Sequence, residues 1–205
     1  MIVIVDYGMG NLGSITNMLR RIGYDSVISK KEEEIAAAEK IILPGVGAFD
    51  QAVNNIHELN LWDVIKQKAM SDQTPLLGIC LGMQLLLDRS EEGNGQGFGF
   101  IKGYAAKFNF SDEQRGFKVP HMGWNNVMPV SPIHPLLRNS EHNMRFYFVH
   151  SYYASCENNE NIIGTTNYGF KFASAIAHNN IMGVQFHPEK SHLFGITLLK
   201  NFCGI

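Results

Sequence analysis

Short apolar runs alternate with helical patterns through the first half of this 205-residue chain, and this alternation is the strongest constraint on its fold. Residues 1–6 form an apolar run that ends at Asp6, and residues 12–22 then repeat apolar side chains at helical spacing until Gly23. Further strand-like runs lie at 26–29, 40–43 and 75–79, and helical stretches lie around 48–70 and 81–89. Apolar strands covered by helices on both faces are typical of a parallel sheet. We therefore predict an α/β fold with a mostly parallel central sheet flanked by helices.

The second half has a different pattern, in which strand-like runs follow one another with little helix between them. These runs are 99–110, 124–130, 144–153, 162–167, 171–177 and 181–186. We expect them to add mixed or antiparallel strands, and we expect a last helix over residues 193–202. No repeat, low-complexity tract or Pro/Ser-rich linker marks a boundary, so residues 1–205 are expected to form a single domain.

Composition argues against several classes of protein. The chain has 45% hydrophobic and 18% charged residues, as in an ordinary globular protein. Its 17 Lys and Arg against 19 Asp and Glu give no global charge that favours nucleic acid or an anionic membrane. The most apolar stretch, 75–87, is interrupted by glycines and is too short to cross a bilayer. The first residues lack the features of a signal peptide, and three cysteines favour a reducing compartment, so we expect a cytoplasmic protein.

The most informative motif lies where the 75–79 run meets the 81–89 helical stretch. Cys80 is flanked there by Gly78 and Gly82, which is the pattern of a nucleophile elbow. In an elbow the nucleophile occupies a strained turn, and small residues two positions away on each side let the backbone double back. The following helix N-terminus favours a thiolate. We interpret Cys80 as a nucleophile, and the alternative is a buried structural cysteine in a tight turn.

A thiolate nucleophile needs a base, and one of the eight histidines suits that role. His187 follows the 181–186 run, at the end of an expected strand, and Glu189 lies two residues further on. With Pro188 fixing the backbone between them, the carboxylate could orient the imidazole as the third member of a triad. For His187 considered alone, a hydrogen-bonded histidine at a strand end is the alternative.

A glycine-rich turn offers donors for an oxyanion. Residues 44–47 read Pro-Gly-Val-Gly and follow the 40–43 run, so we expect them at the same sheet edge as Cys80. Backbone N–H groups of this turn and of Leu81 could stabilise a tetrahedral intermediate. An ordinary strand-to-helix turn is the alternative.

A second pattern points to a different chemistry. Residues 8–13 read Gly-Met-Gly-Asn-Leu-Gly, a literal dinucleotide-binding fingerprint after the first strand. The acid that should bind the ribose about 20 residues further on is absent or displaced, although Ser29, Lys30 and Lys31 suit a 2′-phosphate. An NADP-binding oxidoreductase is therefore an alternative, but one that leaves the candidate triad unexplained.

Six motifs together resemble a known family, the class I or triad glutamine amidotransferases, and within it the glutaminase subunits of imidazole glycerol phosphate synthase. They read D-Y-G-M-G-N at 6–11, P-G-V-G-A-F at 44–49, G-I-C-L-G-M-Q at 78–84, P-H-M-G-W-N at 120–125, Y-F-V-H-S-Y at 147–152 and V-Q-F-H-P-E-K-S at 184–191. The resemblance runs from end to end. It implies hydrolysis of L-glutamine in histidine biosynthesis, with ammonia channelled to a separate (β/α)₈ cyclase subunit in a heterodimer, and no metal or redox cofactor.

The resemblance also implies roles for particular residues. Cys80 would form a γ-glutamyl thioester, His187 would act as acid and base, and Glu189 would orient the imidazole. The oxyanion hole would comprise Leu81 N–H and the Gly45–Val46 peptide, which is expected to reorient before it donates, so that the isolated subunit is nearly inactive without its substrate-loaded partner. The implied glutamine-binding residues are Gly47, Gln84, Ser151 and Tyr152. The implied partner-surface residues are Asn11, Met122, Trp124, Tyr147 and Lys190.

Alternatives to these assignments follow from the same residues. Core packing is the alternative for Met122 and Trp124, and we interpret His121 and His150 as structural histidines. A related glutaminase that feeds ammonia to a different synthase, such as one that forms amidino sugars of surface polysaccharides, is the main alternative function, and the 91–103 loop is assigned to neither group. A non-enzymatic scaffold is a third hypothesis, but an intact candidate triad argues against it.

Overall fold

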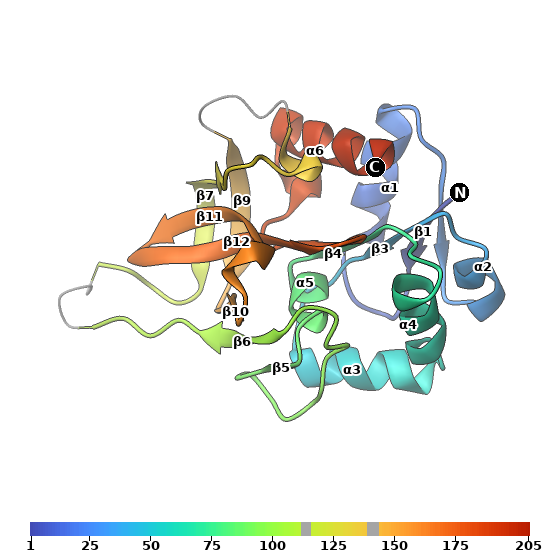
Figure 1. The fold of residues 1–205 in the computed structure, drawn as a ribbon, viewed down its shortest axis with the longest axis horizontal. Coiled ribbons are helices and arrows are strands. Elements are labelled where there is room, and N and C mark those ends of the chain that lie inside the picture. The colour runs from blue at the N-terminus through green and yellow to red at the C-terminus, as the bar shows by residue number, and fades with distance from the viewer. Residues whose placement is uncertain (112–115, 139–143) are drawn as a thin grey trace.

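The computed structural model describes residues 1–111, 116–138 and 144–205 (Figure 1). In these ranges the strands form one large sheet, ordered β2-β1-β3-β4-β13-β12-β10-β6-β5, and a separate β7-β9 ribbon. In the large sheet β11 also pairs with β12, and β8 pairs with β11. Helices cover both faces of the parallel part of the large sheet. The predicted α/β fold, with a mostly parallel centre and additional antiparallel strands, is confirmed.

The parallel part consists of β1 (Ile2–Val5), β2 (Ser26–Ser29), β3 (Lys40–Leu43), β4 (Leu76–Ile79) and β13 (Ile181–Val184). The three strands β1, β4 and β13 are buried along their whole length, because helices cover both of their faces. Side chains along a strand point alternately to two separate cores. In β3, for example, Ile41 and Leu43 enter one core and Ile42 enters the other.

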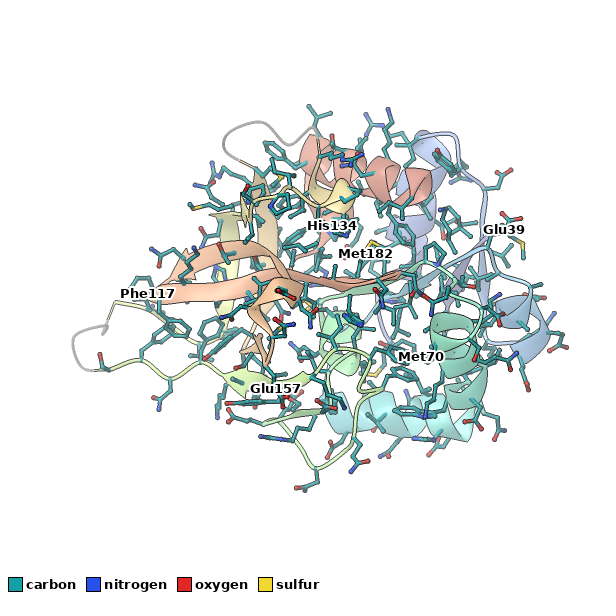
Figure 2. All side chains as sticks on the ribbon, in the orientation of Figure 1. Glu39, Met70, Phe117, His134, Glu157 and Met182 are labelled. Atoms are coloured by element: carbon teal, nitrogen blue, oxygen red, sulfur yellow. The ribbon has the colours of Figure 1, made fainter. Side chains whose placement is uncertain are left out.

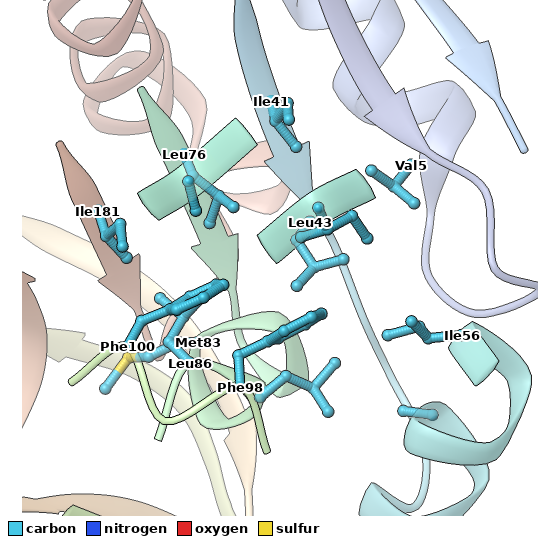
Figure 3. Close-up of a cluster of buried hydrophobic side chains, with 14 of the residues drawn as sticks. Val5, Ile41, Leu43, Ile56, Leu76, Met83, Leu86, Phe98, Phe100 and Ile181 are labelled. Atoms are coloured by element: carbon cyan, nitrogen blue, oxygen red, sulfur yellow. The ribbon is translucent and has the colours of Figure 1, made fainter. Parts of the chain in front are cut away.

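One core lies under α1 (Leu12–Arg21) and α6 (His192–Gly204), and the other under α2 (Glu32–Ala36), α3 (Phe49–Glu58), α4 (Trp62–Met70) and α5 (Leu81–Leu85). Figure 3 shows the second core, where Phe98 and Phe100 of the 91–103 segment pack with Met83 and Leu86 against the sheet. Met182 of β13 is buried and lies inside the molecule in Figure 2, whereas the exposed Phe117 lies at its left edge. None of the described helices has the length and apolar character needed to span a bilayer.

The additional strands are β5 (Arg89–Ser90), β6 (Gly103–Lys107), β7 (His121–Asn126), β8 (Met128–Pro129), β9 (Arg145–His150), β10 (Tyr152–Cys156), β11 (Ile162–Tyr168) and β12 (Phe170–His178). Most of them pair in antiparallel fashion, as expected, although β5 and β6 are parallel. One expectation was incomplete, because β13 is antiparallel to β12 but parallel to β4. It therefore joins the two halves of the sheet.

Several predicted boundaries were wrong, each for a local reason. The helical stretch 48–70 is two helices, because Asn60 adopts a positive φ of 56° between α3 and α4. The helix after Cys80 ends at Leu85, and residues 89–90 pair with β6 instead. The runs 124–130 and 144–153 each divide into two strands, the second of them at Ser151. The short α2 was not expected, because only Ile35 of its five residues is buried.

Candidate active site

Cys80 lies in a strained turn between β4 and α5. Its backbone angles, φ 54° and ψ −107°, are ones that a residue with a side chain rarely adopts. A Cβ on Gly78 would lie 2.5 Å from the Gly82 carbonyl oxygen, and a Cβ on Gly82 would lie 1.8 Å from the Leu43 carbonyl oxygen of β3. Both glycines are therefore required by close backbone approach, and the turn has the shape of a nucleophile elbow.

The candidate base reaches the elbow from the neighbouring strand. The Cys80 N–H donates to the Val184 carbonyl at 2.8 Å, which ties the elbow to the end of β13. His187 follows three residues later, and its N–H donates to the Tyr147 carbonyl of β9 at 2.9 Å. The Ser191 hydroxyl donates to the His187 carbonyl at 2.6 Å and accepts from the Tyr147 N–H at 3.0 Å. The backbone of His187 is thus fixed on two sides.

Glu189 and His187 form a buried pair. Their side chains are 3% and 1% exposed, and the Glu189 Oε1 atom lies 2.8 Å from His187 Nδ1. Burial by itself lowers the pKa of His187, but the Cys80 and Glu189 side chains outweigh that effect and raise the pKa to about 10. The Cys80 and Glu189 side chains therefore both favour the charged form of the His187 ring, so the imidazole can accept the thiol proton.

A cavity of about 300 Å³ opens beside Cys80. Most of the residues that the sequence predicted for the oxyanion hole and for glutamine binding line it, namely Val46, Gly47, Leu81, Gln84, Ser151 and Tyr152. Gly45 directly precedes Val46 and is not among the residues that line the cavity. A Cβ at position 45 would clash with the Tyr7 hydroxyl and the Leu81 side chain. The Tyr7 hydroxyl donates to the Pro44 carbonyl. The structure therefore brings the 44–47 turn and the elbow together, as the spacing indicated.

Two further residues of this site were missed by the sequence reasoning. Glu92 is the charged residue among those that line the cavity, and its Oε2 accepts from the Phe49 N–H at 2.8 Å. Gln185 is buried, and its Nε2 lies 3.7 Å from Cys80 Sγ. Glu92 belongs to the 91–103 loop, whose glycine-rich sequence gives no signal of a contact with the start of α3. Gln185 lies inside the motif around His187 and could have been suspected from that position.

The glycine-rich segment 8–13 contacts the 44–47 turn. Gly8 and Gly10 have φ values of 83° and 111°, and a Cβ on Gly10 would lie 3.2 Å from Pro44. Helix α1 begins at Leu12 after its cap residue Asn11. Packing against Pro44 thus accounts for Gly10, and a positive φ accounts for Gly8, whereas no close contact requires a glycine at position 13. Within the described ranges, no group of three or more His, Cys, Asp or Glu side chains is placed to hold a metal ion.

Four of the five predicted partner-surface residues are exposed, and the fifth, Tyr147, is half-buried. Met122 and Trp124 of β7 are 62% and 40% exposed, which rules out the core-packing alternative. Tyr147 of β9 is the register partner of Trp124, and Lys190 Nζ lies 5.5 Å from the Tyr147 ring centre. Asn11 caps α1, a helix that contacts the 188–190 turn.

A larger cavity, of about 690 Å³, lies elsewhere on the chain, along the 93–99 part of the glycine-rich loop and beside Trp62, Arg89 and Lys102. None of the residues predicted for catalysis or substrate binding lines it. The chemistry is therefore expected at the smaller cavity beside Cys80.

Known proteins resemble this chain over nearly its whole length. A family model described as glutamine amidotransferase class-I matches residues 3–204. The chain belongs to the class-I glutamine amidotransferase family. This amidotransferase is 54% identical to imidazole glycerol phosphate synthase subunit HisH 2 of Methanococcus maripaludis and 48% identical to the protein of the same name from Pseudomonas aeruginosa, in each case over 98% of both chains. The amidotransferase fold also superposes on the solved structure of PurLQS from Thermotoga maritima, with a TM-score of 0.71 at 17% identity over 99% of this chain and 97% of that one.

Proposed function

We propose that this amidotransferase is the glutaminase subunit of an imidazole glycerol phosphate synthase. It hydrolyses L-glutamine to glutamate and ammonia in the cytoplasm, as a single domain, and passes the ammonia to a (β/α)₈ cyclase subunit for histidine biosynthesis. The observation that carries the glutaminase activity is Cys80 in its elbow, with His187 and Glu189 behind it and a cavity in front. The pathway is supported by relatives of that name that match nearly the whole chain.

The proposed chemistry uses the geometry in two steps. In the first, the Cys80 thiol proton passes to His187, Sγ attacks the side-chain carbonyl of glutamine, and the carbon–nitrogen bond breaks as His187 protonates the departing ammonia. In the second, His187 takes a proton from water, the resulting hydroxide attacks the thioester, and glutamate leaves as the thiol re-forms. Glu189 keeps the imidazole oriented and stabilises its charged form in both steps.

The oxyanion of each tetrahedral intermediate would be held by backbone N–H groups of Leu81 and of the Gly45–Val46 peptide. The Tyr7 hydroxyl anchors the Pro44 carbonyl just before that peptide, so a reorientation is confined to the residues that follow. Val46 is 43% exposed, which leaves room for such a rotation. We propose that docking of the cyclase subunit drives it.

Substrate binding is assigned to the cavity residues Gly47, Gln84, Ser151, Tyr152 and Glu92. The α-ammonium of glutamine needs an acceptor, and the Glu92 carboxylate is the anionic group in the lining. Glu92→Gln is therefore expected to raise KM for glutamine about tenfold, with a smaller effect on kcat, because a charged hydrogen bond is exchanged for a neutral one. Steady-state glutamate release measures both constants. Equal KM values for the variant and the unmodified chain would remove Glu92 from the binding site.

The cyclase subunit is assigned to the exposed β7–β9 face, formed by Met122, Trp124, Tyr147 and Lys190, with Asn11 nearby. Aromatic side chains next to a flexible methionine and a cation are typical of an interface centre. Trp124 also stacks on the His192 ring at 5.5 Å, so it is already ordered on this surface.

The test is glutamate release by the purified chain, alone and with the cyclase subunit carrying a nucleotide acceptor analogue, beside a Cys80→Ala control. We expect the loaded cyclase subunit to increase the rate of glutamate release greatly, and we expect Cys80→Ala to abolish this release. If glutamine labels Cys80 as a thioester but this partner gives no stimulation, the ammonia goes to a different synthase.

A further inference from the structure

Two buried histidines outside the candidate triad are joined in one chain of hydrogen bonds. His121 of β7 and His150 of β9 are register partners, and His121 Nδ1 lies 3.0 Å from His150 Nε2. The Asn125 amide nitrogen lies 3.2 Å from His121 Nε2, and His150 Nδ1 lies 2.7 Å from the Tyr152 carbonyl oxygen. The chain thus runs from β7 to the wall of the candidate active-site cavity.

The direction of every bond in this chain is determined by its two ends. The Asn125 amide nitrogen also donates to the Asn167 carbonyl at 3.0 Å, so it is the donor toward His121 Nε2. His121 therefore carries its proton on Nδ1 and donates to His150 Nε2. His150 in turn carries its proton on Nδ1 and donates to the Tyr152 carbonyl, which can only accept.

Both rings must be neutral for this arrangement. They lie among aromatic side chains, with the His121 ring stacked on Phe148 and Tyr168 at 4.7 and 4.0 Å. Burial lowers the pKa of His121 to about 4, and burial lowers that of His150 to about 3. Each ring accordingly has one donor and one acceptor nitrogen at neutral pH.

The chain continues into the site through the Tyr152 carbonyl. The Gln84 amide nitrogen lies 3.4 Å from that carbonyl and 3.4 Å from the Gln185 Oε1 atom. Both of its hydrogens are therefore directed to protein acceptors, which leaves the Oε1 atom as the part of this cavity-lining amide that can accept a hydrogen bond. Gln185 Nε2 completes the chain at Cys80 Sγ.

We propose that His121 and His150 are positioning residues for glutamine, which fix the Tyr152 carbonyl and through it the orientation of the Gln84 amide in the cavity. The inference rests on the proposed glutaminase function and deepens it. A Gln84 amide held this way offers an acceptor to the N–H groups of glutamine. Loss of the donor on His150 frees the Tyr152 carbonyl and lets the Gln84 amide rotate.

Matched substitutions separate this role from simple packing. An asparagine amide reaches about as far from the backbone as Nδ1, whereas a glutamine amide reaches as far as Nε2. His150→Asn therefore retains a donor to the Tyr152 carbonyl, and His150→Gln does not. With the cyclase subunit present, we expect His150→Gln to raise KM for glutamine about five- to tenfold with kcat changed less than about twofold, the size of one lost hydrogen bond. His150→Asn should restore most of the affinity.

The same two substitutions at position 121 test whether His121 donates from its Nδ1 atom. His121→Asn keeps a donor to His150 Nε2, whereas His121→Gln frees that nitrogen to carry the proton and turns a bare Nδ1 toward the Tyr152 carbonyl. As at position 150, we expect the Gln variant to raise KM for glutamine more than the Asn variant does. If the Asn and Gln variants shift KM equally at both positions, or shift only the melting temperature, the two histidines act by packing alone and the proposal is overturned.

Two measurements do not depend on turnover. Histidine ¹⁵N chemical shifts of the unmodified chain should show Nδ1–H tautomers for His121 and His150 at pH 7, and the opposite tautomer for either one overturns the proposal. Calorimetric binding of glutamine to Cys80→Ala, alone and combined with each His150 variant, should show the same ranking as KM. An unmodified chain that, with the substrate-loaded cyclase subunit, neither releases glutamate nor forms a thioester at Cys80 would instead refute the proposed function, while these two readouts would still test the chain of hydrogen bonds.

Discussion

The elbow predicts a large effect for one added methyl group. In Gly82→Ala the new Cβ would lie 1.8 Å from the Leu43 carbonyl oxygen and 2.8 Å from the Leu43 carbonyl carbon, and both atoms belong to the backbone of a central strand. Neither can rotate away, so the elbow and β3 must separate by about 1.5 Å to reach ordinary van der Waals distance. Overpacking of this kind costs about 2 kcal/mol, which for a chain of this size lowers the melting temperature by about 6 °C.

The same separation moves Cys80 and Leu81 away from the Pro44–Gly45 segment, so activity should fall more than stability. A misplacement of about 1 Å can cost a hundredfold in rate, and we expect kcat for glutamate release to fall by about that factor. Thermal unfolding by circular dichroism and glutamate release with the cyclase subunit measure the two effects.

Gly13→Ala is the matched control for this substitution. A Cβ at position 13, in α1, meets no atom within 4 Å. The alanine should raise the melting temperature by about 1–3 °C, because it replaces the residue with the lower helix propensity. A Gly82→Ala protein that melts within about 1 °C of the unmodified chain and retains its kcat would show that the contact between elbow and strand is not as close as argued.

Three further outcomes follow from the site. Burial raises the pKa of the Cys156 thiol to about 11, so iodoacetamide at pH 7.5 should alkylate Cys80 well before Cys156, as peptide mass spectrometry will show. Glu189→Gln removes a charge that holds the pKa of His187 at about 10, so kcat should fall at least a hundredfold. The stabilisation by charged His187 is fully present below its ordinary pKa of about 6.5 and is lost as the pH rises toward 10. Glu189→Gln should therefore lower the free energy of unfolding, measured in urea, by more at pH 6 than at pH 9. Equal decreases at the two pH values would contradict the charged pair of His187 and Glu189. Trp124→Ala should weaken cyclase binding at least tenfold in calorimetry while the melting temperature of the isolated chain moves by less than about 2 °C, and unchanged affinity would place the interface elsewhere.

The sequence predicted the parallel part of the fold well because its signals are local. The ranges expected for β2 and β3 are those observed, and β1 and β4 differ by one or two residues. Strands β1 and β4 are covered on both faces and therefore read as continuous apolar runs, whereas β2 is an edge strand whose two central residues are exposed. The break at Asn60 and the short β5 carry no such signal, since one depends on a single backbone angle and the other on pairing with a distant strand.

The residues missed at the site are those whose role depends on contacts distant in the sequence. Glu92 lines the cavity, and its carboxylate accepts a hydrogen bond from Phe49 at the N-terminus of α3, 43 residues away along the chain. His121 and His150 are 29 residues apart, and a histidine taken singly looks structural, as the sequence interpretation had it. Only the register between β7 and β9 shows that the two rings are bonded to each other and to the cavity wall.

The same dependence on register explains how Cys80 and His187 meet. Strand β13 pairs with β4 so that Gly183 lies opposite Gly78 and Val184 opposite Ile79. A Cβ on Gly183 would lie 2.7 Å from the Met83 side chain, and one on Gly78 would lie 2.5 Å from the Gly82 carbonyl, so the two adjacent glycines together make room for α5. A slip of one residue would place Met182 or Val184 under the helix and turn the side chains of β13 to the opposite faces. The glycine in β13 thus selects the one register that brings His187 to the elbow, and Gly183→Ala should disturb the triad although no atom of residue 183 belongs to it.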